Sequence, residues 1–292
     1  MNKPGDKQGV RTDLSRPSPS RPGVLEVLAA PFSAFTRHRA LTRELVRSEV
    51  LGRYRGANFG LLWSLISPFL MLIVYTIAFG EIMKSRWPQA PDSNAEFSII
   101  LFLGIIVHGF FAECFTRAPR LMLENSNYVK RVVFPLEILP WAMALSALFH
   151  TAMNLVVFVL LSLLVYQQLS VYVLLLPLVL VPLILMTMAA SWLMASLGVY
   201  VRDIAQVTPV IATAMFFLSS AIIPMEAVPE KFRLVFALNP LTFLINQARD
   251  VALWGKPPDW VGLAIYTTVS LVAAYLAFAW FRKTSKGFAD VL

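Results

Sequence analysis

Few residues in this sequence have the types and spacing that a chemical site requires. The three histidines, His38, His108 and His150, are scattered and share no metal-ligand spacing. The one cysteine, Cys114, lies in an apolar run and has no second thiol to pair with. The chain contains no G-x-x-x-x-G-K-S/T phosphate loop, no G-x-S-x-G turn and no His-Glu-x-x-His helix. We therefore predict a protein that is not an enzyme, holds no metal or cofactor and does not hydrolyse ATP by the phosphate-loop mechanism.

Two of the histidines fall in apolar runs long enough to cross a membrane. An ionisable group at such a position is a candidate for function. His108 and His150 have no partner that the sequence reveals, and we interpret them as packing residues. No such run carries the several acidic residues of a proton or sodium relay. The sequence therefore predicts a conduit that takes its energy from another protein.

Composition places the elements that must hold this conduit in a membrane. Only 14% of the residues are charged and 58% are hydrophobic, whereas a soluble domain carries about 25% charged residues. The polar surface is too small to face water all round, so we predict an all-α integral membrane protein. The net charge of +8 is typical of cytoplasmic Lys and Arg beside membrane spans, and we predict no binding of nucleic acid.

Six apolar runs approach or exceed the 20 or so residues that a transmembrane helix needs. The expected spans are 60–79, 97–115, 135–165, 171–201, 204–223 and 260–280. With the N-terminus inside, most of the 25 Lys and Arg residues fall on the cytoplasmic side. We therefore expect both termini in the cytoplasm.

The rest of the chain divides around this membrane domain, which we place at 60–281. Residues 1–23 are polar and rich in Pro, Ser and Arg, which predicts a disordered cytoplasmic tail and no cleavable signal peptide. Residues 24–59 hold a basic amphipathic helix that is expected to lie in the cytoplasmic headgroup region. Residues 282–292 are expected to be a cytoplasmic tail.

Two connecting segments are not simple loops. Residues 117–131 carry too much charge to enter the hydrocarbon, and they predict either a solvated loop or a short helix that docks into a partner protein. Residues 224–258 are broken by prolines but apolar between them, which favours re-entrant or interfacial helices on the outer face. Such breaks are tolerated at membrane depth where they meet protein or line a water-filled path.

An ordered set of short motifs resembles a known family. The opening R-Y-R-G at 53–56 is followed by G-L-L-W at 60–63 and by Pro68. Further matches are N-x-N-Y-x-K-R at 125–131, R-D-I at 202–204, Asn239-Pro240 and the C-terminal F-A-D-V-L. Together they resemble the membrane subunit of ABC type-2 polysaccharide exporters, and look most like the O-antigen and teichoic-acid types, over about residues 35–292.

That resemblance implies the architecture and the partners. It implies a homodimer of six-helix subunits in the bacterial inner membrane, with two separate ATP-binding cassette subunits that bind ATP and Mg. The implied substrate is an undecaprenyl-pyrophosphate-linked polysaccharide of O-antigen, teichoic-acid or capsule type. By position, the helix before Arg53 becomes an interface helix, and the helix that couples to the ATPase includes Glu124, Asn125, Asn127 and Tyr128. The outer gate helices include Pro224, Glu226, Asn239 and Pro240.

Elementary chemistry adds two sets of candidates to this frame. Cations at the cytoplasmic mouth would attract the carrier pyrophosphate; the candidates are Arg53, Arg55, Lys130 and Arg131. Aromatic rings would let sugars slide if no single contact is strong; the candidates are Trp63, Phe69, Tyr75, Phe110 and Phe111.

Two other functions fit parts of the sequence. A small-molecule or drug efflux subunit would share the fold, although the R-Y-R-G and G-L-L-W opening favours polysaccharide. A membrane-embedded glycosyltransferase or protease would need acidic or nucleophilic constellations, and the sequence offers none. Export of a glycan is the function that the sequence favours.

Overall fold

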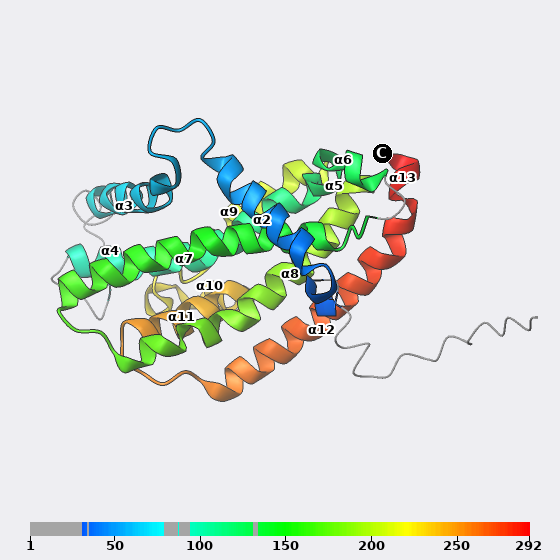
Figure 1. Cartoon of the computed structure of the whole chain (residues 1–292). Helices are drawn as coiled ribbons and strands as arrows, with labels where there is room; N and C mark the ends of the chain where they lie inside the picture. The colour runs from blue at the N-terminus through cyan, green and yellow to red at the C-terminus, as the bar shows by residue number, and fades with distance from the viewer. Residues whose placement is uncertain (1–30, 34, 79–86, 88–93, 131–133) are drawn as a thin grey trace, which may run out of the picture.

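The computed structural model describes residues 31–33, 35–78, 87, 94–130 and 134–292, and these residues form helices and connecting turns without a strand element (Figure 1). The prediction of an all-α membrane protein is confirmed in this part of the chain. The predicted disordered tail at 1–23 and the first residues of the predicted amphipathic region lie outside the described residues.

Five of the six predicted spans are helices long and apolar enough to cross a membrane. They are α3 (Trp63–Tyr75), which follows the 3-10 turn η1 (Gly60–Leu62), α4 (Asn94–Arg117), α7 (Ile138–Tyr166), α8 (Leu176–Tyr200), which follows η4 (Val171–Leu175), and α12 (Trp260–Thr284). Each contains a run of large aliphatic side chains that suit a lipid environment. Because each is helical, its backbone hydrogen bonds are made within the helix, where lipid offers no partners.

The sixth span is shorter than the sequence predicts. Helix α9 (Ile204–Phe217) has 14 residues, which at 1.5 Å per residue is about 21 Å, against a hydrocarbon core of about 30 Å. The expected span at 204–223 is therefore corrected, because the last six residues form a turn instead. Ser219 explains the break, since its hydroxyl bonds the carbonyl of Phe216 and accepts from the amide of Ala221, which offers the backbone an alternative to the helix.

Short helices occupy both ends of the bundle. On the cytoplasmic side of the expected topology are α2 (Arg39–Arg53), η3 (Ala118–Arg120), α5 (Leu121–Glu124), α6 (Ser126–Val129), η6 (Ser285–Gly287) and α13 (Phe288–Val291). On the outer side are η5 (Met225–Ala227), α10 (Glu230–Leu238) and α11 (Pro240–Ala252). The residues predicted as a C-terminal tail are thus helical, and Phe288 is fully buried against Phe281 and Tyr200.

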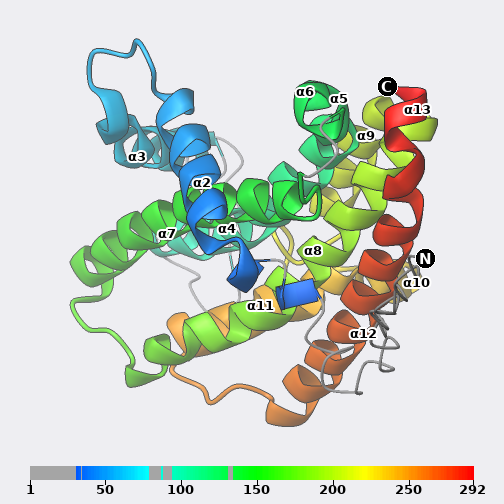
Figure 2. The same ribbon diagram turned by 45° about the vertical axis from the view of Figure 1, so that its right-hand side comes forward.

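The core forms around α4, which contacts α7, α8, α9 and α11. In the most apolar stretch of α4, 72% of the residues are buried, whereas in that of α3 only 17% are buried. Helix α3 touches mainly α7 and α4 and stands at one side of the molecule, away from α12 (Figures 1 and 2). Within one chain, therefore, α3 leaves most of its apolar surface uncovered.

Candidate functional site

The amphipathic helix α2 lies against α7, at the end of the bundle that the expected topology places on the cytoplasmic side and that we call the cytoplasmic end. Its approach is fixed by Trp141 of α7, whose indole donates to the carbonyl of Pro31 at 3.0 Å and packs against the rings of Phe32 and Phe35. The basic residues of α2 remain largely exposed. The predicted basic amphipathic helix is present in the described part of the segment.

A network of ion pairs joins the end of α2 to the end of α4. Arg53 pairs with Glu113. Arg117 pairs with the same carboxylate at 3.4 Å and with Glu49 of α2 at 3.0 Å. The side chains are one-fifth to two-fifths exposed, so water and salt screen the attractions between them. The network holds α2 on the bundle with charges that solvent reaches.

Of the cations predicted to bind phosphate, one takes part in the ion-pair network and two have no ion pair to a described residue. Arg53 is committed to Glu113. Arg55, two residues on, is exposed and has no ion pair to any described residue, and Lys130 is likewise exposed. Arg131 lies outside the described residues. A positive φ of 86° at Gly56 turns the chain directly after Arg55 toward the first span.

The two histidines in the spans have partners that the sequence does not reveal. The ring of His150 lies 3.1 Å from the Tyr54 hydroxyl, directly beside the ion-pair network. His108 contacts the carbonyl of Ala212 at 2.9 Å and packs on the ring of Phe216, so it joins α4 to α9. The interpretation of these histidines as packing residues stays a prediction, and the Nε2 atom of His150 is buried without a hydrogen bond to a described residue.

The charged segment after α4 folds into the one-turn helices α5 and α6, broken at Asn125. Its base is anchored on α8: a Cβ built at Gly198 would lie 2.1 Å from the carbonyl oxygen of Pro119, so the two backbones touch with no side chain between them. Leu121 and Met122 are buried at the same contact. The predicted short helix is therefore present as two turns on a rigid base.

The predicted coupling residues divide between the exposed and the packed side of this segment. Glu124 and Asn127 are exposed, as is Lys130; Glu124 ends α5, whereas Asn127 lies in α6 and Lys130 directly follows it. Asn125 donates to the carbonyl of Leu121 at 2.9 Å, while Tyr128 stacks on Phe134 with ring centroids 4.6 Å apart. The exposed face presents charged and polar groups that are suited to contact another protein.

The predicted channel aromatics do not form one group. Phe69 on α3 is 45% exposed, and Trp63 and Tyr75 on the same helix are half-buried. Phe110 and Phe111 on α4 are 3% and 4% exposed and pack inside the chain. The rings of α3 therefore have surface available to a neighbour or a passage, whereas the two rings of α4 contact protein.

At the outer end, Asn239 closes the break after α9. Its side-chain nitrogen donates to the carbonyls of Met215 and Leu218 at 2.8 and 2.9 Å, and its side-chain oxygen accepts from the amide of Leu241 at 3.0 Å. One amide thereby satisfies the free end of α9 and caps α11, where Pro240 is the first residue. Of the four predicted gate residues, Asn239 joins the most elements.

Arg249 on α11 closes the same break from the other side. It donates to the carbonyls of Ile100 and Ala221 at 3.1 and 2.9 Å and also to that of Ser220. The residue is 1% exposed, and no described carboxylate forms an ion pair with it. Its guanidinium stacks on the indole of Trp87 at 4.3 Å. A buried cation is thus compensated by carbonyl dipoles and an aromatic face.

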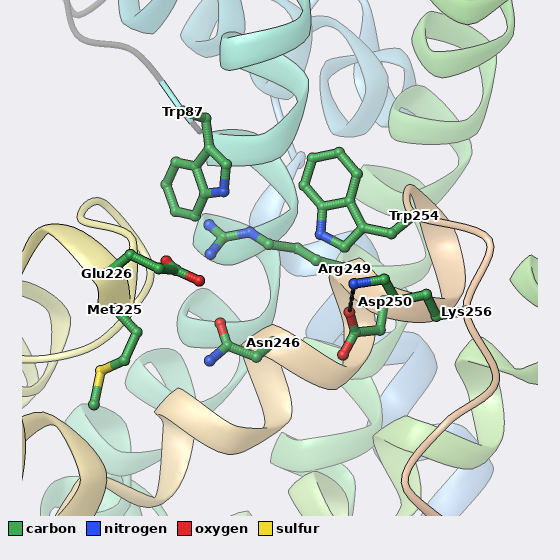
Figure 3. Close-up of a pocket in the computed structure, with 8 residues that line it drawn as sticks. All are labelled: Trp87, Met225, Glu226, Asn246, Arg249, Asp250, Trp254 and Lys256. Carbon is green, nitrogen blue, oxygen red and sulfur yellow. Dashed lines mark ion pairs between the residues drawn. The ribbon is translucent and has the colours of Figure 1, made fainter. Parts of the chain in front are cut away.

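A polar cavity of about 190 Å³ opens beside this arginine (Figure 3). Its lining is Trp87, Met225, Glu226, Asn246, Arg249, Asp250, Trp254 and Lys256. Burial raises the pKa of the Asp250 carboxyl, and Lys256, 3.9 Å away, opposes that rise. Burial lowers the pKa of Arg249 to about 9, which leaves it protonated at neutral pH.

Sequence reasoning does not single out Arg249, Trp87, Asn246 or Trp254. A signal for Arg249 exists in the chain, since it is a cation in a helix that also carries many apolar residues. Its partners, however, lie 28 to 149 residues away in the sequence, and a spacing pattern does not reveal them.

The sequence matches the family described as ABC-2 type transporter over residues 40–253. It is 24% identical over 256 residues to the O-antigen export system permease protein RfbA of Myxococcus xanthus, which covers 87% of this chain and 96% of that protein. A Klebsiella pneumoniae protein of the same name is 25% identical, over 82% of this chain and 90% of its own length. The polysialic acid transport protein KpsM of Escherichia coli is 23% identical, over 86% and 95% of the two chains.

Proposed function

Since the chain belongs to the ABC-2 type transporter family, we propose that it is the membrane subunit of an ATP-driven exporter of lipid-linked polysaccharide. The observation that carries the proposal is similarity to permeases named for O-antigen export and polysialic acid transport across nearly their whole lengths. The matches cover 90–96% of the lengths of those proteins. O-antigen is the glycan class that we propose first, and capsule the second.

The energy comes from two separate ATP-binding subunits, which bind the ATP and Mg that this chain's sequence has no phosphate loop to hold. Their contact is the exposed face of α5 and α6 with Glu124, Asn127 and Lys130. The support for this contact is its construction: the polar face is free while the opposite face is anchored on α8. A firm base under an exposed polar face suits a segment that receives force from a partner.

A second copy of the chain completes the path. Helix α3 leaves an apolar face uncovered, and α9 exposes a similar one; the exposed residues include Phe69, Leu70, Val74, Val207, Val210 and Ile211. Two copies that meet at these helices bury those faces and enclose a passage between them. The exposed ring of Phe69 then becomes available to the moving glycan, with weak contacts that permit sliding.

The carrier pyrophosphate enters from the cytoplasmic side. Arg55 and Lys130 are the cations of the predicted mouth that are exposed and have no ion pair to a described residue, and a diphosphate binds strongly to guanidinium and ammonium donors. This arrangement requires the bacterial inner membrane with both termini in the cytoplasm. Reporter fusions at the two termini test that orientation, and a periplasmic signal from either one contradicts it.

The proposal is tested by deletion of the gene in its own host, with complementation from a plasmid. Lipid-linked glycan is then fractionated between the cytoplasmic membrane and the cell surface. We expect long polysaccharide to accumulate inside and to disappear from the surface, and the plasmid copy to reverse both changes. Normal surface glycan in the deletion strain contradicts export and favours the efflux of small amphiphiles.

A further inference from the structure

The cavity beside Arg249 has the construction of a binding site rather than of a packing defect. Its walls come from four segments: the residue Trp87 before α4, the turn η5, helix α11 and the connection to α12 (Figure 3). A void left by imperfect packing is apolar and dry, whereas this one is lined mainly by charged, amide and indole groups. We infer that it binds one uncharged sugar unit of the exported glycan on the outer face, an inference that rests on the proposed function.

The size of the cavity agrees with a single sugar ring. At about 30 Å³ for each water in the liquid, the cavity of about 190 Å³ has the volume of roughly six waters. A hexopyranose with its hydroxyls takes up about the volume of that many waters. A long acyl chain finds no matching apolar trough here, since few of the lining residues are aliphatic.

The polar groups of the wall match the hydroxyls of a sugar. The amide of Asn246 and the carboxylate of Glu226 have no hydrogen bond or ion pair to any described residue. Arg249 uses three of its five N–H groups on carbonyls. Donors and acceptors therefore stand together at the cavity, as a ring of hydroxyls that both donate and accept requires.

The aromatic groups supply the apolar part of the recognition. Trp254 is partly exposed and lines the cavity, where an indole can pack against the C–H face of a pyranose. Trp87 is 5% exposed and covered on one side by the guanidinium of Arg249. It therefore serves as the support that orients the arginine, while Trp254 is the ring that stacks on the ligand.

The charges of the wall favour an uncharged ligand. Arg249 and Lys256 are balanced by Glu226 and Asp250, so the lining has no net charge at neutral pH. A phosphate in this space would gain from the two cations and lose to the two carboxylates. A neutral hydroxyl-rich ring meets no such opposition.

The test is saturation-transfer NMR on the full-length protein in lipid nanodiscs. The probe is the repeat-unit oligosaccharide released by mild acid from the host's own surface polysaccharide. We expect Asn246→Ala and Glu226→Ala each to raise the dissociation constant at least fivefold, because each removes a group that has no other described partner. The control is Glu230→Ala on α10, whose side chain is 91% exposed and outside the cavity.

Each result decides the inference. Unchanged affinity in both cavity variants overturns it, and so does stronger binding of inorganic phosphate than of the oligosaccharide. Full export by the wild-type protein with no oligosaccharide binding overturns the inference but leaves the proposed function intact. Normal surface glycan in the deletion strain overturns the proposed function, and the inference with it.

Discussion

The two ends of the bundle are held together by opposite kinds of interaction. At the cytoplasmic end, Arg53, Glu113 and Arg117 form ion pairs that solvent reaches. At the outer end, Asn239 and Arg249 donate from buried side chains to backbone carbonyls. An exposed ion pair contributes about 0–1 kcal/mol, whereas a buried polar group left without a partner costs about 1–3 kcal/mol. The comparison teaches that the cytoplasmic end can rearrange cheaply and the outer end cannot.

The difference follows from the length of α9. A helix that stops inside the bilayer leaves carbonyls that no lipid can satisfy, so side chains from α11 and the turn before it must reach them. At the cytoplasmic end the helices run into water, and the same backbone groups are hydrated without help. The five predictions below test this contrast from the largest expected loss of stability to the smallest.

The largest effect is expected for Arg249→Met. The change leaves three buried carbonyls, including those of Ser220 and Ala221, without their donor, and we expect the free energy of unfolding to fall by about 3 kcal/mol or more. The measurement is the yield of folded protein and its Tm in detergent. Lys231→Met on α10 removes an exposed cation from the same face and serves as the control. Equal Tm values for the two variants would remove the basis of the comparison.

Asn239→Ala should come next. It removes the donor to Met215 and Leu218 and the cap of α11, and we expect a loss of about 1–3 kcal/mol, read as a lower Tm. Asn127→Ala, on the exposed face of α6, makes the same chemical change where no buried group depends on it. If the two alanine variants have the same Tm, the Asn239 contacts contribute nothing to the stability of the protein.

Gly104→Ala tests how closely α4 approaches the buried arginine. A Cβ there would lie 2.6 Å from the Arg249 side chain and 2.9 Å from the carbonyl oxygen of Ala221, so we expect overpacking to cost about 1–3 kcal/mol. Gly109→Ala on the same helix meets nothing within 4 Å and should be neutral or stabilising, because alanine favours a helix. A Gly104→Ala protein as stable as its Gly109→Ala control would show that the outer end is loosely packed.

Glu113→Gln should lower the free energy of unfolding by less than about 1 kcal/mol, since the ion pairs with Arg53 and Arg117 are partly exposed. The wild-type advantage should shrink further as salt is raised from low ionic strength. Glu230→Gln, at an exposed outer position, is the control. A loss of more than about 2 kcal/mol would place the cytoplasmic network in the same class as the outer one.

Glu124→Lys should leave stability within about 0.5 kcal/mol of wild type, because the side chain is exposed. It should nevertheless reduce the surface glycan of the complemented deletion strain, because it reverses the charge on the face proposed to meet the ATPase. Glu230→Lys makes the same charge reversal on the outer side and should support normal export. Normal export by the Glu124→Lys protein would contradict the proposed coupling face.

Apolar runs predict most of this fold, because a helix in lipid must be both long and apolar, and five of the six spans have those properties. The end of α9 is not predictable in this way, since residues 218–223 are apolar enough to continue a span and the hydrogen bonds at the break include those of Ser219, Asn239 and Arg249. The outer short helices agree with the prediction from their prolines, whereas the C-terminal helices η6 and α13 lie where a tail was predicted.

Side-chain roles are predicted less well than helices. Arg53 is predicted at the mouth, and its ion pair with Glu113, 60 residues away, is not visible in the sequence. Arg249 is not among the predicted site residues, although its buried side chain joins three segments. Both observations come from contacts between distant segments, which hydrophobic periodicity does not encode. The remaining assignments of coupling, mouth and gate residues stay predictions for the variants above.

The close approach of Gly198 to Pro119 has a mechanical consequence. Two backbones in direct contact leave no flexible side chain to absorb a displacement, and densely packed protein transmits strain. A displacement of α5 and α6 is therefore transmitted to α8 as a rigid-body motion. Helix α12, which packs along α8, is the next element to move. Gly198 allows this close contact. A larger residue there would force the two backbones apart, so a partner would have to move α5 and α6 further to displace α8 by the same amount.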